Sequence, residues 1–235
     1  MSSSAFNWRA FDAYLFDIDG TLLNTRDGVH YNSFHTALRE VYGCEGRIDE
    51  VPVHGNTDIG ILRAALAHHG LRVDGEFESK LPRALELMCA EVERHAHRIQ
   101  PQLCPSITEF LEALHAQGKL LGIVTGNLQR IGWRKLEQAG IRQYFDFGSF
   151  SDKNEKREDI FRNGAEQVRK LRGSATTVCV VGDTPSDIRA ALELGLPVIA
   201  VATGIYGIEE LRALGPVCCV TNLASLLNDE AAITQ

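Results

Sequence analysis

Five short apolar runs recur along the chain, and each is bounded by turn-forming residues. They are rich in branched side chains and show no alternation of apolar and polar positions, which is typical of strands covered on both faces. The runs span 13–16, 120–124, 178–181, 198–201 and 217–220. The pattern predicts a buried, mostly parallel β-sheet.

Helical patterns lie between the last four of these runs, where a parallel sheet needs crossover connections. Ahead of the second run, Ser106 and Glu109 have the spacing of a capping box at the start of an apolar stripe. Further helices are predicted at 134–139, 160–171 and 185–194, and a glycine follows within two residues of each. The chain therefore reads as an α/β fold built from repeated βα units.

The stretch between the first and second runs has a different pattern. It shows helical periodicity at 29–42, 57–69 and 81–97 and no convincing strand. We therefore predict a helical insertion at 24–100, with the sheet-forming core at 1–23 and 101–235.

Composition narrows the possible functions. The chain has 235 residues, of which 44% are hydrophobic and 23% are charged, which is typical of a soluble globular protein. A formal net charge of −7 argues against nucleic acid as a partner, because polyanions require clustered basic residues. The six cysteines lack the spacing of a zinc site and are interpreted as buried thiols. With no leader-like or membrane-spanning stretch, we expect a cytoplasmic protein with no membrane segment.

Polar residues follow three of the predicted strands directly. Asp17 and Asp19 come after the first run, Thr-Gly-Asn occupies 125–127, and Gly-Asp-Thr occupies 182–184. Ligands of open parallel sheets bind at these carboxyl ends. Gathered carboxylates cost stability unless a cation or ligand compensates them, so a functional site is favoured over a surface turn rich in Asp and Gly.

These residues also carry a family resemblance. DIDGTL at 17–22, VTGN at 124–127 and VGDTPSDIRAA at 181–191 are similar to three signature motifs of the haloacid dehalogenase-like (HAD) hydrolase superfamily, in the family's order. The resemblance, to phosphoglycolate phosphatase-like members, implies a Rossmann-like three-layer core with a mostly parallel sheet and an inserted α-helical cap. It further implies a Mg²⁺-dependent phosphatase of a small phosphorylated metabolite, such as phosphoglycolate or a sugar phosphate.

The resemblance assigns roles to four aspartates. Asp17 would attack the phosphorus and form an aspartyl-phosphate, and Asp19 would serve as general acid and base with an elevated pKa. Mg²⁺ would be held by the Asp17 and Asp183 carboxylates and the main-chain carbonyl of Asp19. Asp187 would orient the metal shell or act as a ligand through water.

The second motif implies contacts to the phosphoryl oxygens. They would come from the Thr125 hydroxyl and from the main-chain N–H groups of Gly126 and Asn127.

The family also places a lysine or arginine between the second and third motifs. The commoner Lys-Pro-x-Pro form is absent, which leaves Lys156 and Arg157 as candidates. Arg157 is favoured because Asp-Ile follows two residues later, as in a variant of this motif, and because its guanidinium suits phosphate. The alternative is that both are solvated charges in the charged run 152–159.

Substrate selection is expected within the insertion. The segment 54–58 resembles a substrate-facing loop of helical caps, which makes Thr57 a candidate substrate contact, although Thr57 could equally cap the helix that follows. The histidines at 68–69 and at 95 and 97 point to different helix faces and predict no metal site.

Several other functions share the implied fold. A dehalogenase needs neither a metal nor a second acid, so Asp19, Asp183 and Asp187 argue against it. A phosphonatase needs a lysine from the cap, and Lys80, the only lysine of the insertion, has no supporting context. A β-phosphoglucomutase-like phosphotransferase uses the same two aspartates, but Thr21 is the more phosphatase-like residue at its position. A catalytically inactive binding module is disfavoured because both Asp17 and Asp19 are present.

Overall fold

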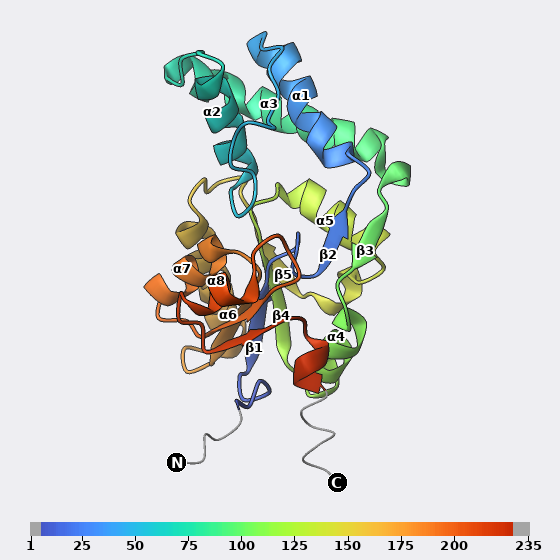
Figure 1. The fold of residues 1–235 in the computed structure, drawn as a ribbon, viewed down its shortest axis with the longest axis vertical. Helices are drawn as coiled ribbons and strands as arrows, with labels where there is room; N and C mark the ends of the chain where they lie inside the picture. The colour runs from blue at the N-terminus through green and yellow to red at the C-terminus, as the bar shows by residue number, and fades with distance from the viewer. Residues whose placement is uncertain (1–5, 228–235) are drawn as a thin grey trace.

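The computed structural model describes residues 6–227 and contains a six-stranded sheet in which every pair of neighbours is parallel (Figure 1). The strand order is β5-β4-β1-β6-β7-β8. The strands are β1 (Ala13–Phe16), β4 (Leu120–Val124), β5 (Phe147–Ser149), β6 (Val178–Gly182), β7 (Val198–Val201) and β8 (Cys218–Val220). All five predicted runs are strands. β5 was not predicted, because its three residues, one of them glycine, leave almost no apolar pattern.

Helices cover both faces of this sheet (Figure 1). α4 (Ile107–Ala116) and α5 (Gln129–Gln138) share an apolar cluster on one face. α6 (Arg157–Arg172), α7 (Pro185–Glu193) and α8 (Ile208–Arg212) share a cluster on the other. The predicted three-layer, Rossmann-like α/β class is therefore confirmed.

Two local predictions were wrong. Ser106 has a left-handed backbone with φ of 59° and makes no capping hydrogen bond through its side chain, so the capping box is absent although α4 forms. Cys218 and Cys219 are only partly buried, because β8 is an edge strand of the sheet, whereas the other four cysteines are buried.

Three helices pack together beyond the carboxyl ends of the strands (Figure 1). They are α1 (Val29–Tyr42), α2 (Asp58–His68) and α3 (Gly75–Arg94), and they are called here the helical unit. An antiparallel ribbon of β2 (Leu23–Thr25) and β3 (Pro101–Leu103) joins this unit to the core. β2 crosses the predicted boundary at 23/24, and β3 begins at the predicted boundary at 100/101. The domain division stays a prediction. Two parts of the predicted core, residues 1–5 and 228–235, lie outside the described residues.

Connecting segments complete the chain. Short 3₁₀ helices, η1 (Ala96–Arg98) and η2 (Arg142–Tyr144), follow α3 and α5. Among residues 6–227, no helix has both the length and the apolar character that crossing a bilayer requires.

The central position of β1 determines where the first motif emerges. Phe16, its last residue, lies in register with Ile123 of β4 and Val181 of β6. Every residue of β1 is fully buried. Asp17 therefore leaves the sheet between the loops that follow β4 and β6, which carry the other two motifs.

Candidate active site

A cavity of about 430 Å³ lies at these strand ends, between the core and the helical unit. The predicted site residues that line it are Asp17, Asp19, Thr125, Gly126, Asn127, Arg157 and Asp183. Thr57, Lys156 and Asp187 are not among its lining residues. The three motifs, at 17–22, 124–127 and 181–191, thus meet around one space.

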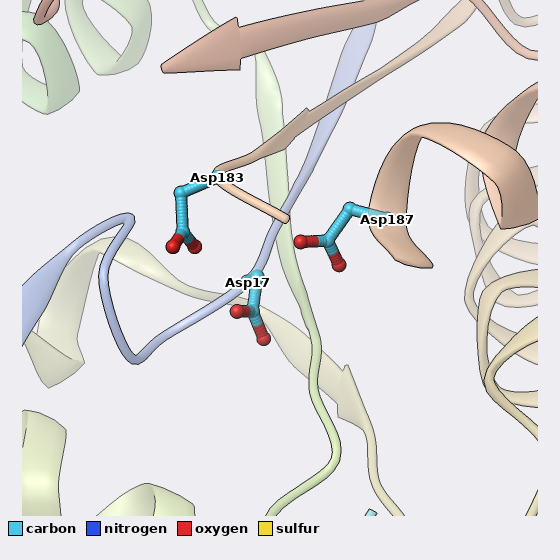
Figure 2. Close-up of side chains that lie close together, drawn as sticks. All are labelled: Asp17, Asp183 and Asp187. Atoms are coloured by element: carbon cyan, nitrogen blue, oxygen red, sulfur yellow. The ribbon is translucent and has the colours of Figure 1, made fainter. Parts of the chain in front are cut away.

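Three carboxylates cluster where Asp17 and Asp183 line the cavity. One oxygen from each of Asp17, Asp183 and Asp187 lies within 4.8 Å of the others (Figure 2). All three side chains belong to buried residues. Burial raises the pKa of Asp183 well above its ordinary value, and the Asp17 and Asp187 charges raise it further, against the Thr21 hydrogen bond. When ionised, the three carboxylates therefore repel one another.

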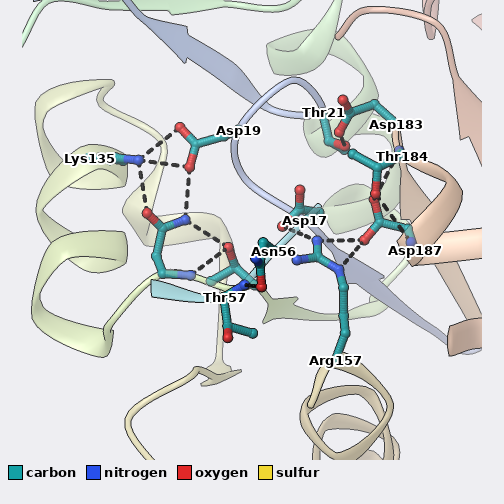
Figure 3. Close-up of polar contacts among 12 residues, drawn as sticks. Asp17, Asp19, Thr21, Asn56, Thr57, Lys135, Arg157, Asp183, Thr184 and Asp187 are labelled. Atoms are coloured by element: carbon teal, nitrogen blue, oxygen red, sulfur yellow. Dashed lines mark hydrogen bonds and ion pairs between the residues drawn. The ribbon is translucent and has the colours of Figure 1, made fainter. Parts of the chain in front are cut away.

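Arg157 partly neutralises this cluster. Its guanidinium Nη2 lies 3.0 Å from Asp17 Oδ1 and 2.5 Å from Asp187 Oδ1, and Nε donates to the same Asp187 oxygen at 2.8 Å (Figure 3). Burial raises the pKa of Asp17, Arg157 lowers it, and the Asp187 charge raises it again, with a net rise. One arginine does not offset the burial of three carboxylates.

Lys156 has a different environment from its neighbour. It is exposed and occupies the N-cap position of α6. The buried Arg157 begins the helix on the side that faces the cluster. The alternative in which both residues are solvated charges therefore does not hold for Arg157.

Asp187 is fixed by its own helix as well as by Arg157. Thr184 and Asp187 form a capping box, in which Asp187 Oδ2 accepts from the Thr184 N–H at 3.0 Å and from its hydroxyl at 2.7 Å. The other Asp187 oxygen accepts from Arg157. With both oxygens engaged, Asp187 is better suited to positioning Arg157 than to direct coordination of a cation.

Asp183 lies in a tight backbone cradle. The Thr21 hydroxyl donates to its Oδ1 at 2.8 Å. Gly20 has φ of +88°, and a Cβ there would lie 2.2 Å from Asp183 Oδ2. Glycine is therefore required in the DIDGTL motif both for its backbone conformation and for the space it leaves.

A second polar network surrounds Asp19. Lys135 Nζ donates to both Asp19 carboxylate oxygens, at 2.8 and 2.7 Å, and to Asn127 Oδ1 at 2.8 Å (Figure 3). Asn127 Nδ2 donates to Asp19 Oδ2 and lies 2.8 Å from the Thr125 hydroxyl oxygen. Asp19 is thereby turned away from the cluster of three carboxylates, which leaves its main-chain carbonyl as the predicted metal ligand.

The expected elevated pKa of Asp19 is contradicted in this arrangement. Burial acts to raise the pKa, but the Lys135 charge and the hydrogen bonds from Lys135 and Asn127 bring it below its ordinary value. The prediction considered only crowding by Asp17, because the cation that dominates was not recognised.

Lys135 is the functional candidate that sequence reasoning missed. It lies on α5, and its side chain belongs to a residue that is only 3% exposed. The available signal was its position four residues after Ile131 and next to Leu136, on the buried stripe of an otherwise polar helix. A lysine on such a stripe requires a buried partner.

Thr57 caps α2, as the alternative interpretation held. Its hydroxyl oxygen accepts from the Gly60 N–H at 3.1 Å, and the hydroxyl donates to the Glu155 carbonyl at 2.9 Å. The next residue, Asp58, joins the helical unit to the second motif. Its N–H donates to the Gly126 carbonyl, and its Oδ2 accepts from the Leu128 N–H, both at 2.8 Å.

The donor set of the cluster fits a hard divalent cation. Oxygen ligands are those that Mg²⁺ prefers, and a cation there would relieve the repulsion described above. Among residues 6–227, Asp17, Asp183 and Asp187 form the one group of this kind, and no histidine belongs to it.

Comparison with known proteins identifies the family. The model of the haloacid dehalogenase-like hydrolases matches residues 14–201. The chain belongs to this family. The match contains all three motifs and, between them, the whole helical unit, so the predicted family and the predicted class of enzyme, a hydrolase, are confirmed.

Curated relatives resemble the chain over nearly its full length. A protein of Dickeya dadantii named probable phosphatase IndB is 28% identical over 94% of both chains. A phosphoglycolate phosphatase of Vibrio vulnificus is 29% identical over 91% of this chain and 93% of its own. The pyrophosphatase PpaX of Halalkalibacterium halodurans is 25% identical, with coverages of 91% and 94%.

Solved structures show the same fold. CbbY from Rhodobacter sphaeroides, crystallised with phosphate, superimposes with a TM-score of 0.60 at 17% identity, covering 88% of this chain and 97% of its own. A hydrolase from Pseudomonas syringae gives a TM-score of 0.61 at 20% identity, with coverages of 92% and 98%.

We predict that Mg²⁺ raises the melting temperature of the wild-type protein. At a hundredfold excess over Kd, the linkage relation gives about 2.7 kcal/mol, or roughly 5–10 °C for a chain of this size. Because the raised pKa values of Asp17 and Asp183 let protons compete with the cation, the shift grows between pH 5.5 and 8.

Differential scanning fluorimetry measures this shift directly. Asp183→Asn should lose most of it, whereas Asp159→Asn, which removes an Asp on the surface of α6 paired with Arg162, should keep it. Equal shifts in the two variants would place the cation elsewhere.

Proposed function

We propose that this chain is a Mg²⁺-dependent phosphatase that hydrolyses a small phosphorylated metabolite through an aspartyl-phosphate on Asp17. The observation that carries the proposal is the placement of Asp17 in the cavity, beside the buried Arg157 and with one carboxylate oxygen within 4.8 Å of one from Asp183. The phosphatases named among its relatives support the same reaction class.

Asp17 acts as the nucleophile. It attacks the phosphorus of the ester, and the bond to the alcohol oxygen breaks as the aspartyl-phosphate forms. Mg²⁺ held by the Asp17 and Asp183 carboxylates would supply the positive charge that lets an anionic carboxylate approach an anionic phosphate. Arg157, held by Asp187, contributes a second positive charge and fixes the orientation of the Asp17 carboxylate.

Asp19 acts as general acid and then as general base. It donates a proton to the departing alkoxide and later takes one from the water that hydrolyses the aspartyl-phosphate. A bound phosphate dianion raises the pKa of a neighbouring carboxyl, which opposes the lowering by Lys135 and favours protonated Asp19 in the first step. Lys135 and Asn127 hold the carboxylate at the edge of the cavity.

Three further groups bind the transferred phosphoryl group. The Thr125 hydroxyl and the main-chain N–H groups of Gly126 and Asn127 follow β4 and line the same cavity. Donors already held in place by the protein stabilise the charge that develops in the transition state.

We further propose that residues 24–100 form a cap on a core of 1–23 and 101–235. The packing of Asp58 against Gly126 and Leu128 supports a cap that closes over the second motif. The bidentate pair of Arg63 on α2 with Glu155, before α6, adds a second contact between the helical unit and the core.

We predict that Asp17→Asn lowers the hydrolysis of 4-nitrophenyl phosphate in the presence of Mg²⁺ by at least about 10³-fold, because an amide is no nucleophile toward phosphorus. Release of 4-nitrophenol measures the rate, and Asp159→Asn is the control. Full activity in Asp17→Asn would exclude the aspartyl-phosphate.

We also predict that Arg157→Ala lowers kcat/KM by about 10²–10³-fold, whereas Lys156→Ala changes it less than about threefold. Arg157 contacts the nucleophile, while Lys156 faces solvent. Steady-state kinetics after a check of folding by circular dichroism measures both. Similar small losses in the two variants would mean that Arg157 has no role in catalysis. The variant Arg157→Lys tests whether a positive charge alone is sufficient at this position.

A further inference from the structure

The cavity extends past the catalytic aspartates to a surface on which a leaving group would rest. We call this surface the outer wall. It comprises His30, Tyr31, Phe34, Ile48, Asp49, Val53, His54 and Ile61 of the segment 30–61, together with Ile205 of the core. A volume of about 430 Å³ exceeds what a phosphoryl group occupies, so the outer wall has room for a substantial leaving group.

The outer wall contains no lysine or arginine. Among residues 6–227, the lysines and arginines that line the cavity are Lys135 and Arg157. Lys135 is paired with both oxygens of Asp19, and Arg157 is paired with Asp17 and Asp187. Any further anionic group on a substrate would therefore find no free lysine or arginine among the lining residues.

Two acidic residues lie in this part of the cavity, and each already has a partner. Asp49 and Asp58 both line it. His30 Nε2 lies 3.2 Å from Asp58 Oδ2, so a positive charge on this imidazole would be balanced by its partner. Arg47, which is paired with Asp49, is 67% exposed and is not a lining residue.

Most of the remaining outer wall is apolar. Phe34, Ile48 and Ile61 are buried members of the apolar cluster of the helical unit and form the base of this surface. The apolar surface that a leaving group can still cover belongs to the partly buried Tyr31 and Val53 and to Ile205, which is 62% exposed. A leaving group with an apolar face gains free energy by covering these three side chains. A carboxylate in the same place would lose water without a compensating cation.

We infer that the substrates are phosphomonoesters whose leaving group is uncharged and has an apolar or aromatic face. Esters whose leaving group carries a carboxylate or a second phosphate are disfavoured. This inference rests on the proposed phosphatase function and assigns its substrate class. It sets the chain apart from the substrates in the names of its phosphoglycolate phosphatase and pyrophosphatase relatives.

Two matched pairs of substrates test the charge preference. They are 4-carbamoylphenyl against 4-carboxyphenyl phosphate, and the amide of phosphoglycolate against phosphoglycolate itself. The assays are run with Mg²⁺ at pH 8, where free imidazole is neutral. Uncatalysed hydrolysis rates correct for the different reactivities of the esters. We expect the uncharged member of each pair to have at least a tenfold higher kcat/KM.

A pair of variants at one position isolates the effect of charge. Ile205→Lys adds a cation at the exposed rim of the outer wall, and Ile205→Gln adds a polar side chain without charge. In the lysine variant, the ratio of kcat/KM for the uncharged ester to kcat/KM for the charged ester should fall by about fivefold or more in each pair, because lysine supplies the missing counter-charge. In the glutamine variant, the same ratio should fall by less than about twofold.

Each outcome has a distinct meaning. The inference is supported if the wild type prefers the uncharged esters and if Ile205→Lys, but not Ile205→Gln, reduces that preference. If the carboxylate esters react as fast as the uncharged ones, the inference is overturned while the phosphatase proposal stands. If neither these esters nor 4-nitrophenyl phosphate reacts with Mg²⁺, the proposed function fails and the inference falls with it.

Discussion

The mutual repulsion of buried carboxylates at the end of β1 is the constraint on which the rest of this site depends. Asp17, Asp183 and Asp187 lie within a few ångströms of one another, where water cannot screen their charges. Arg157 compensates part of that charge. Such a cluster costs stability and has no role in packing, so its presence points to a cation and an anionic substrate that together complete the balance.

The fold assigns the two reactive aspartates to different partners. Asp17 continues straight from the central strand into the cluster with Arg157, whereas Asp19, two residues later, is paired with Lys135 from α5. Two carboxylates of the same loop thus have opposite electrostatic surroundings, and the pKa of Asp17 is raised while that of Asp19 is lowered. Both shifts run against the proposed roles, because a nucleophile must be ionised and a proton donor must be protonated. The proposed mechanism therefore requires a cation to lower the pKa of Asp17 and a bound phosphate to raise that of Asp19.

Sequence reasoning found what local patterns encode and missed what only packing decides. The buried runs gave the sheet, and the motifs at their ends placed Asp17, Thr125 and Asp183 together. It missed β5, which is too short for a pattern, and Lys135, whose partner Asp19 lies more than a hundred residues away in sequence. The predicted rise in the pKa of Asp19 was wrong for the same reason, since an ion pair between residues far apart in sequence leaves no local signal.

A crystal structure with Mg²⁺ and beryllium fluoride, an analogue of a phosphoryl group bonded to a carboxylate, tests this account most directly. The account predicts beryllium bonded to an Asp17 oxygen and a cation in contact with Asp17 and Asp183, with Arg157 still on Asp17. Beryllium fluoride bonded to another residue, or a cation bound away from the carboxylate cluster, would contradict it.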